Sequence, residues 1–91
     1  MDGIIAKRVT YSGVVQGVGF RATATHLAQR FQVSGTARNL PDGTVELVAQ
    51  GTENDVDAFL AAVGRRMGDY IRHQTVDEVP ATQRAGFHII R

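Results

Sequence analysis

The segment from Ser12 to Arg21 reads S-G-V-V-Q-G-V-G-F-R and combines glycines with a single arginine. The glycines at 13, 17 and 19 remove side chains from a turn that is expected to follow a strand and to begin a helix. Backbone N–H groups in such a turn are free to converge on an anion. Arg21 adds a cation in the first turn of the expected helix, where the helix dipole disfavours positive charge by about 0.3 to 1 kcal/mol. The combination predicts that an anion completes the site.

A phosphate suits these donors, because the planar guanidinium of Arg21 matches two phosphate oxygens better than the point charge of a lysine would. A second polar group, Asn39, stands at the end of a later strand-like segment. Its carboxamide both donates and accepts hydrogen bonds, so it can hold a water molecule at a fixed angle. Phosphoryl transfer requires mainly positioning and charge stabilisation from a protein. This set of groups therefore predicts phosphoryl chemistry without a covalent nucleophile.

The first half of the chain predicts a strand, a helix and a β-hairpin. Ile4 to Ser12 alternates apolar with polar residues, as in a half-solvated strand. Apolar residues then recur at helical spacing from Phe20 to Phe31. Two further strand-like segments, 33–40 and 44–50, flank the turn Pro41-Asp42-Gly43.

The second half predicts one more helix and one or two strands. Thr52 is a suitable N-cap for a helix whose apolar stripe runs to Met67, and Gly68 suits its C-terminus. Ile71 to Val79 resembles a fourth strand, and Phe87 to Ile90 a short fifth one. The order β-α-β-β-α-β predicts an α+β, ferredoxin-like split β-α-β sandwich, in which an antiparallel sheet of four to five strands carries two helices on one face.

This topology makes a prediction about the site. If the first strand runs up and the helix returns, the second strand runs up again, and its far end lies at the same sheet edge as the glycine segment. Asn39 is therefore expected to come close to Arg21.

Each of these residues also has a plainer interpretation. Taken alone, the glycines would more often form a tight turn. Arg21 alone would more often be a surface cation, and Asn39 alone a turn residue before Pro41. The segment also matches neither G-x-G-x-x-G nor the Walker pattern, which argues against nucleotide binding. The expected joint position at one sheet edge favours the functional interpretation. The three histidines show no metal-ligand spacing, and the acids after Thr52 are expected to complement a helix dipole.

Composition narrows the remaining possibilities. A chain of 91 residues predicts one domain spanning residues 1–91. With no cysteine, disulfides and zinc–thiolate sites are excluded. The net charge of +1 is smaller than nucleic-acid binders usually carry, and strands two and three lack the exposed aromatics of an RNA-binding module. No apolar run is long enough for a membrane span, so we expect a cytoplasmic protein. Nothing indicates an obligate interface, and we expect a monomer.

Two segments carry a family resemblance: G-V-V-Q-G-V-G-F-R at 13–21 and G-T-A-R-N-L-P-D-G-T-V-E at 35–46. At this separation they closely resemble the two signature segments of the acylphosphatases. The resemblance implies hydrolysis of the carboxyl–phosphate bond of small acyl phosphates, without a metal or other cofactor, and inorganic phosphate as product and competing ligand. It implies that Arg21 binds the phosphate and that Asn39 positions the water. The phosphate loop would consist of Val15, Gln16, Gly17, Val18, Gly19 and Phe20, followed by Arg21.

The chain departs from the family pattern in two places. Thr36 stands where an aromatic residue is frequent, and residues 66–72 replace a common Gly-Pro-containing turn. An alternative function is a phosphoryl-binding or carbamoyl-phosphate-handling domain of the kind found in hydrogenase maturation factors. The cysteine-rich segments of those proteins are absent from these 91 residues.

Overall fold

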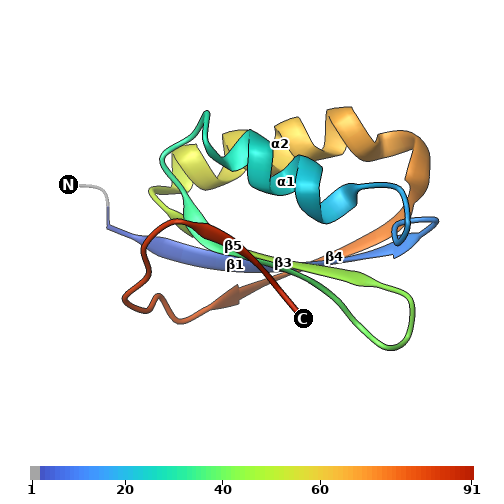
Figure 1. Cartoon of the computed structure of the whole chain (residues 1–91). Coiled ribbons are helices and arrows are strands. Elements are labelled where there is room, and N and C mark those ends of the chain that lie inside the picture. The colour runs from blue at the N-terminus through green and yellow to red at the C-terminus, as the bar shows by residue number, and fades with distance from the viewer. Residues whose placement is uncertain (1–2) are drawn as a thin grey trace.

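The computed structural model describes residues 3–91, in which five strands form one sheet in the order β4-β1-β3-β2-β5. Both helices lie over the same face of this sheet, as Figure 1 shows. The α+β split β-α-β fold expected from the sequence is therefore confirmed. The elements are β1 Ile5–Gly13, α1 Phe20–Ala28, β2 Ser34–Asn39, β3 Val45–Gly51, α2 Glu53–Met67, a 3₁₀ turn Gly68–Tyr70, β4 Ile71–Val79 and β5 Phe87–Ile90.

One feature of the sheet differs from the expectation. Strands β1 to β4 pair antiparallel, but β5 pairs parallel with β2, so the sheet is mixed. The segment between β4 and β5 runs back past the end of β3, where the Gln50 side chain bonds to both the N–H and the carbonyl of Thr82. The Gly35 N–H then donates to the Gly86 carbonyl at 2.9 Å. These contacts bring β5 to the sheet edge in the direction of β2.

Strand direction brings two distant parts of the chain to one edge. Both β1 and β2 pair antiparallel with β3, so they run parallel to each other. Tyr11 of β1 and Asn39 of β2 lie on either side of the same residue, Val45. The end of β1, which leads into the glycine segment, therefore lies level with the end of β2, as the topology argument expected.

The core lies between the sheet and the two helices. Alternate residues of the central strands, including Val9, Ala37 and Leu47, have no exposed surface. Both helices contribute a buried stripe, and Phe31 and Phe87 both pack against Phe59, with ring centroids 6.2 and 5.4 Å away. Each fully buried apolar side chain of this size contributes about 1.5 to 3 kcal/mol, so this layer holds the helices on the sheet.

Helix ends differ from the sequence-based expectation at two places. Helix α1 ends at Ala28, before Phe31, and residues 29–31 continue as tight turns. Gly68 does follow α2, but it keeps right-handed helical angles, φ −56° and ψ −35°, and the chain continues into the 3₁₀ turn. Neither helix of residues 3–91 is long and apolar enough to cross a membrane.

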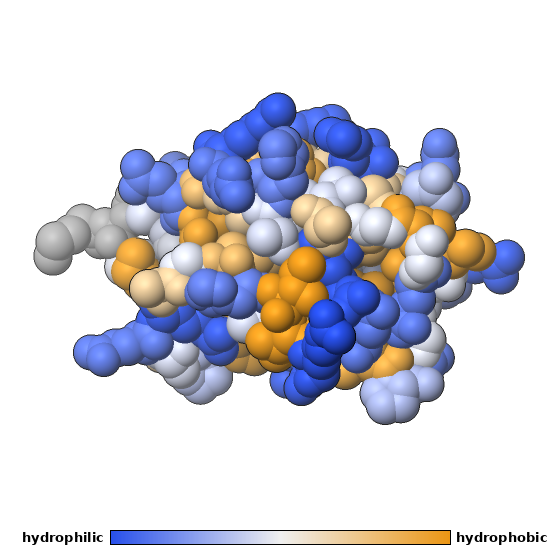
Figure 2. All heavy atoms as spheres, viewed as in Figure 1, coloured by the Kyte–Doolittle hydropathy of each residue, from blue (hydrophilic) through white to orange (hydrophobic). Residues whose placement is uncertain are grey.

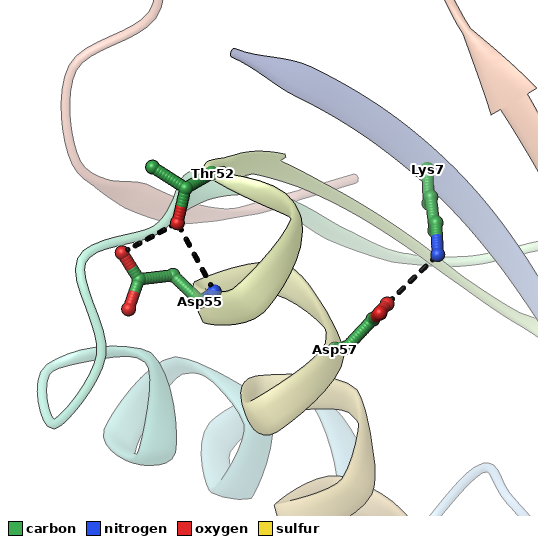
Figure 3. A network of polar contacts seen from close by, with 4 residues as sticks. All are labelled: Lys7, Thr52, Asp55 and Asp57. Carbon is green, nitrogen blue, oxygen red and sulfur yellow. Dashed lines mark hydrogen bonds and ion pairs between the residues drawn. The ribbon is translucent and has the colours of Figure 1, made fainter. Parts of the chain in front are cut away.

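Helix α2 is capped by its own side chains, as expected for Thr52. The Thr52 hydroxyl accepts a hydrogen bond from the Asp55 N–H at 3.2 Å and donates to the Asp55 carboxylate at 3.0 Å (Figure 3). Two residues further, Asp57 pairs with Lys7 of β1 at 2.7 Å (Figure 3). This exposed contact links α2 to β1, but pairs of this kind add little to stability.

Candidate active site

A pocket of about 250 Å³ opens at the edge where β1 and β2 end. Arg21 and Asn39, which the sequence analysis expected to converge, both line it. The full lining comprises Val15, Gly17, Gly19, Phe20, Arg21, Ala22, Asn39, Ile89 and Arg91. Three stretches far apart in the sequence thus contribute to one concave surface.

The glycine loop, residues 15–20, has a buried apolar residue at each end and exposed glycines between them. Val15 and Phe20 are 1% and 2% exposed, and the Phe20 ring lies 4.8 Å from that of Tyr11. Between these anchors, Gly17 and Gly19 are exposed and adopt left-handed backbone angles, with φ of 80° and 79°. Residues with a Cβ rarely adopt these angles, so glycine is required here by conformation. The apolar residues therefore fix the loop while the glycines turn its backbone.

The start of α1 leaves its backbone donors without a side-chain partner. Its N-cap is Gly19, no side chain caps the helix, and no acidic residue stands in the first turn. Helix α2, by contrast, has the Thr52 cap and two acids in its first turn. Uncapped N–H groups and the helix dipole make the start of α1 suited to an anion. Half-buried Arg21 adds a formal positive charge beside them.

Gln16 belongs to the expected phosphate loop, but its side chain serves another contact. The Nε2 group donates to the carbonyls of Leu40 and Thr44 at 2.8 and 2.9 Å. It thereby joins the glycine loop to the turn that follows Asn39. Val18 packs partly buried against the core, and neither Gln16 nor Val18 lines the pocket.

The pocket is also lined by Ala22, Ile89 and Arg91, which no sequence pattern identified as site residues. Ile89 and Arg91 come from β5 and its end, whose partner strand was not predictable from local patterns. Ile89 and Ile90 are 43% and 37% exposed. In Figure 2, hydrophobic side chains gather over β5 next to a strongly hydrophilic group. This side of the pocket therefore combines apolar surface with a guanidinium.

Apart from Arg21 and Arg91, no titratable side chain of residues 3–91 lines the pocket. Of the three histidines, none is among the residues that line it, and His88 contacts the Ala85 carbonyl at 2.8 Å. Within residues 3–91, the His, Asp and Glu side chains form no group of three or more that could hold a metal ion. The chemistry of the pocket thus depends on backbone N–H groups, two guanidiniums and one carboxamide.

A family model and two related sequences all match this chain to the acylphosphatases. A sequence model of the acylphosphatase family matches residues 7–89. An acylphosphatase of Listeria monocytogenes is 41% identical over 86 residues, covering 91% of this chain and 90% of that protein. An acylphosphatase of Methylococcus capsulatus is 53% identical over 53 residues, covering 58% of each chain.

Solved structures show the same fold. The crystal structure of acylphosphatase from Bacillus subtilis superposes with a TM-score of 0.85 at 29% identity, covering 96% of this chain and 99% of that one. HypF from T. kodakarensis matches with a TM-score of 0.83 at 27% identity, but the matched region is only 12% of that protein. From the family match, the relatives and the shared fold, we conclude that this chain belongs to the acylphosphatase family.

Proposed function

We propose that this chain hydrolyses the carboxyl–phosphate bond of acyl phosphates without a metal ion. The loop amides of residues 15–20 and Arg21 bind the phosphoryl group, and Asn39 orients the attacking water. The single observation that carries the proposal is that Arg21, Asn39 and the loop glycines line one pocket. Family membership supports the same reaction class.

The reaction balances with these groups alone. Water attacks phosphorus in line, a new P–O bond forms, and the P–O bond to the acyl oxygen breaks. The acyl oxygen keeps the bonding electron pair, so the products of a dianionic acyl phosphate are a carboxylate and dihydrogen phosphate. Both water protons remain on the phosphate. Because carboxyl groups ionise near pH 4, the leaving group departs as a stable anion and needs no general acid.

The loop and Arg21 stabilise the negative charge of the phosphoryl group. In phosphoryl transfer the negative charge spreads over the equatorial oxygens, and donors fixed before the reaction stabilise it without reorganisation. The loop is suited to this because Val15 and Phe20 are buried beneath it. Asn39 lies on a strand end rather than on a free loop, which favours a fixed water position.

The test compares Arg21→Ala and Asn39→Ala with the parent chain on acetyl phosphate and carbamoyl phosphate. Loss of one fixed charge-stabilising contact lowers turnover about 100- to 1,000-fold, so both variants are expected to lose most activity. Arg30→Ala and Asn54→Ala are the controls, because both residues are exposed and lie outside the pocket, Arg30 in the turn after α1 and Asn54 in α2. Each assay is repeated with a chelator, which is expected to change nothing.

The results distinguish the roles of Arg21 and Asn39, the need for a metal ion, and catalysis from mere phosphate binding. Near-parental turnover of either pocket variant would show that its residue has been assigned wrongly, and loss of activity with the chelator would show a metal requirement. A parent chain that binds inorganic phosphate but hydrolyses neither compound would favour the alternative, a phosphoryl-binding domain. The likeness to a small part of HypF is the observation that keeps this alternative under test.

A further inference from the structure

The parallel pairing of β5 with β2 gives Arg91 a defined position. The register places Ala37 beside Ile89 and Arg38 beside Ile90. Continued by one residue, it places Arg91 beside Asn39, about 4.8 Å away across the strands. Side chains alternate along a strand, so Arg91 shares the face of Ile89, toward the helices. Both residues line the pocket.

This end of the chain is held by several contacts. Phe87 packs on Phe59 in the core with ring centroids 5.4 Å apart. The Gly35 N–H donates to the Gly86 carbonyl, and the Gln50 carboxamide binds both backbone groups of Thr82. The strand that leads to Arg91 is thus fixed from the core and from its preceding loop. The guanidinium starts from a defined backbone position beside the pocket.

The charge of the pocket is unbalanced. Among the described residues that line it, only Arg21 and Arg91 have charged side chains, and both side chains are positive. The ion pairs within residues 3–91 involve Lys7, Arg8 and Arg38, and neither pocket arginine is among them. A single guanidinium would offset half the charge of a phosphoryl dianion, whereas two offset all of it.

We propose that Arg91 is a second guanidinium that binds the transferred phosphoryl group, opposite Arg21 and the loop. This inference rests on the proposed function. In-line attack places the leaving acyl group on the far side of phosphorus from the water. Because Arg91 lies next to Asn39, which orients that water, it faces the equatorial phosphoryl oxygens rather than the acyl group. Arg91 is therefore a catalytic residue that acts on every acyl phosphate alike.

The test uses Arg91→Gln, which removes the charge and shortens the side chain but keeps a polar end, and Arg91→Lys, which keeps the charge and removes the planar fork. Arg84→Gln is the matched control, an exposed arginine of the preceding loop outside the pocket. Calorimetry measures the affinity for inorganic phosphate at low salt. Steady-state assays measure kcat/KM on acetyl phosphate and benzoyl phosphate, which differ only in their acyl groups.

Arg91→Gln is expected to weaken phosphate binding about tenfold, because a charge-assisted hydrogen bond is lost at an exposed position. The kcat/KM of Arg91→Gln is expected to fall by a similar factor on both substrates. Arg91→Lys is expected to have a phosphate affinity and a kcat/KM between those of Arg91→Gln and the parent, whereas Arg84→Gln should match the parent in both. Unchanged phosphate affinity in Arg91→Gln would overturn the inference. So would a loss of kcat/KM on one substrate only, which would assign Arg91 to the acyl group.

Failure of this inference and failure of the proposed function give different results. If the parent hydrolyses both substrates, Arg21→Ala does not, and Arg91→Gln matches the parent, only the role of Arg91 is wrong. If the parent hydrolyses neither substrate, the proposed function is wrong. The phosphate calorimetry then still decides whether Arg91 binds a phosphoryl group.

Discussion

Replacing Gln16 by methionine is expected to loosen the glycine loop without altering any group that lines the pocket. Methionine matches the length and flexibility of glutamine but has no N–H donor. The substitution therefore removes the hydrogen bonds of 2.8 and 2.9 Å to the carbonyls of Leu40 and Thr44. The loop then loses its side-chain connection to the turn that follows Asn39.

The size of the stability loss depends on the hydrogen bonds that each carbonyl retains after the substitution. A hydrogen bond contributes about 0.5 to 1.5 kcal/mol net, so two bonds give about 1 to 3 kcal/mol. The Leu40 carbonyl still accepts from the Gly43 N–H at 3.1 Å, and the Thr44 carbonyl from the Leu40 N–H at 2.9 Å. Neither acceptor is left unpaired, which places the loss in the lower part of that range, about 1 to 2 kcal/mol. For a domain of this size, the melting temperature falls by about 4 to 8 °C per kcal/mol.

Thermal unfolding of Gln16→Met, Gln16→Glu and the parent measures this contact. The glutamate variant is expected to be less stable than the methionine variant near neutral pH, because its carboxylate faces two carbonyl oxygens. Gln29→Met is the control, since Gln29 is exposed and its side chain makes no hydrogen bond within residues 3–91. Both Gln16 variants should also lose kcat/KM, although less than Asn39→Ala. A melting temperature equal to the parent's in Gln16→Met would refute the reasoning.

Two further predictions concern stability. Thr52→Ala removes the cap of α2, and the expected cost of about 1 kcal/mol lowers the melting temperature by several degrees; an unchanged melting temperature would contradict the role of the cap. Burial raises the pKa of Tyr11 above its ordinary value of 10.0, so above about pH 10 the unfolded chain releases this proton before the native one and stability falls as pH rises. Urea unfolding at pH 8 and 10.5 should therefore show a smaller alkaline loss for Tyr11→Phe than for the parent, and equal losses would contradict the assignment. In Tyr11→Phe, stability is still expected to fall somewhat as pH rises, because of Lys7. The pKa of Lys7 is raised from 10.5 chiefly by its hydrogen bond to Asp57, which acts in the same direction.

The sequence predicted those parts of the molecule that depend on local patterns and on strand direction. The helix starts at Phe20 and after Thr52, the hairpin at Pro41-Asp42-Gly43 and the limits of β4 and β5 follow from periodicity, capping and turn chemistry. The shared edge of the glycine loop and Asn39 follows because parallel strands end on the same side. The partner of β5 was not predictable, since parallel pairing depends on long-range contacts such as that of Gln50 with Thr82.

That missing information explains which pocket residues the sequence could not reveal. Ile89 and Arg91 reach the pocket only because β5 pairs with β2. The contact of Gln16 was hidden for a related reason. Its position in the loop was recognised, but the direction of its side chain depends on the turn at residues 40–44, which packs against it only in the folded chain.

The two helices show how stability and function are divided in this fold. Helix α2 has a side-chain acceptor for the Asp55 N–H in the Thr52 hydroxyl, and it carries two acids in its first turn. Helix α1 has a glycine N-cap, no acid in its first turn and Arg21 in a position that the helix dipole disfavours. In the proposed reaction the phosphoryl oxygens accept from those free N–H groups and offset the arginine charge. A ligand thus takes the place of the missing cap, and bound phosphate should stabilise the folded chain in proportion to its affinity.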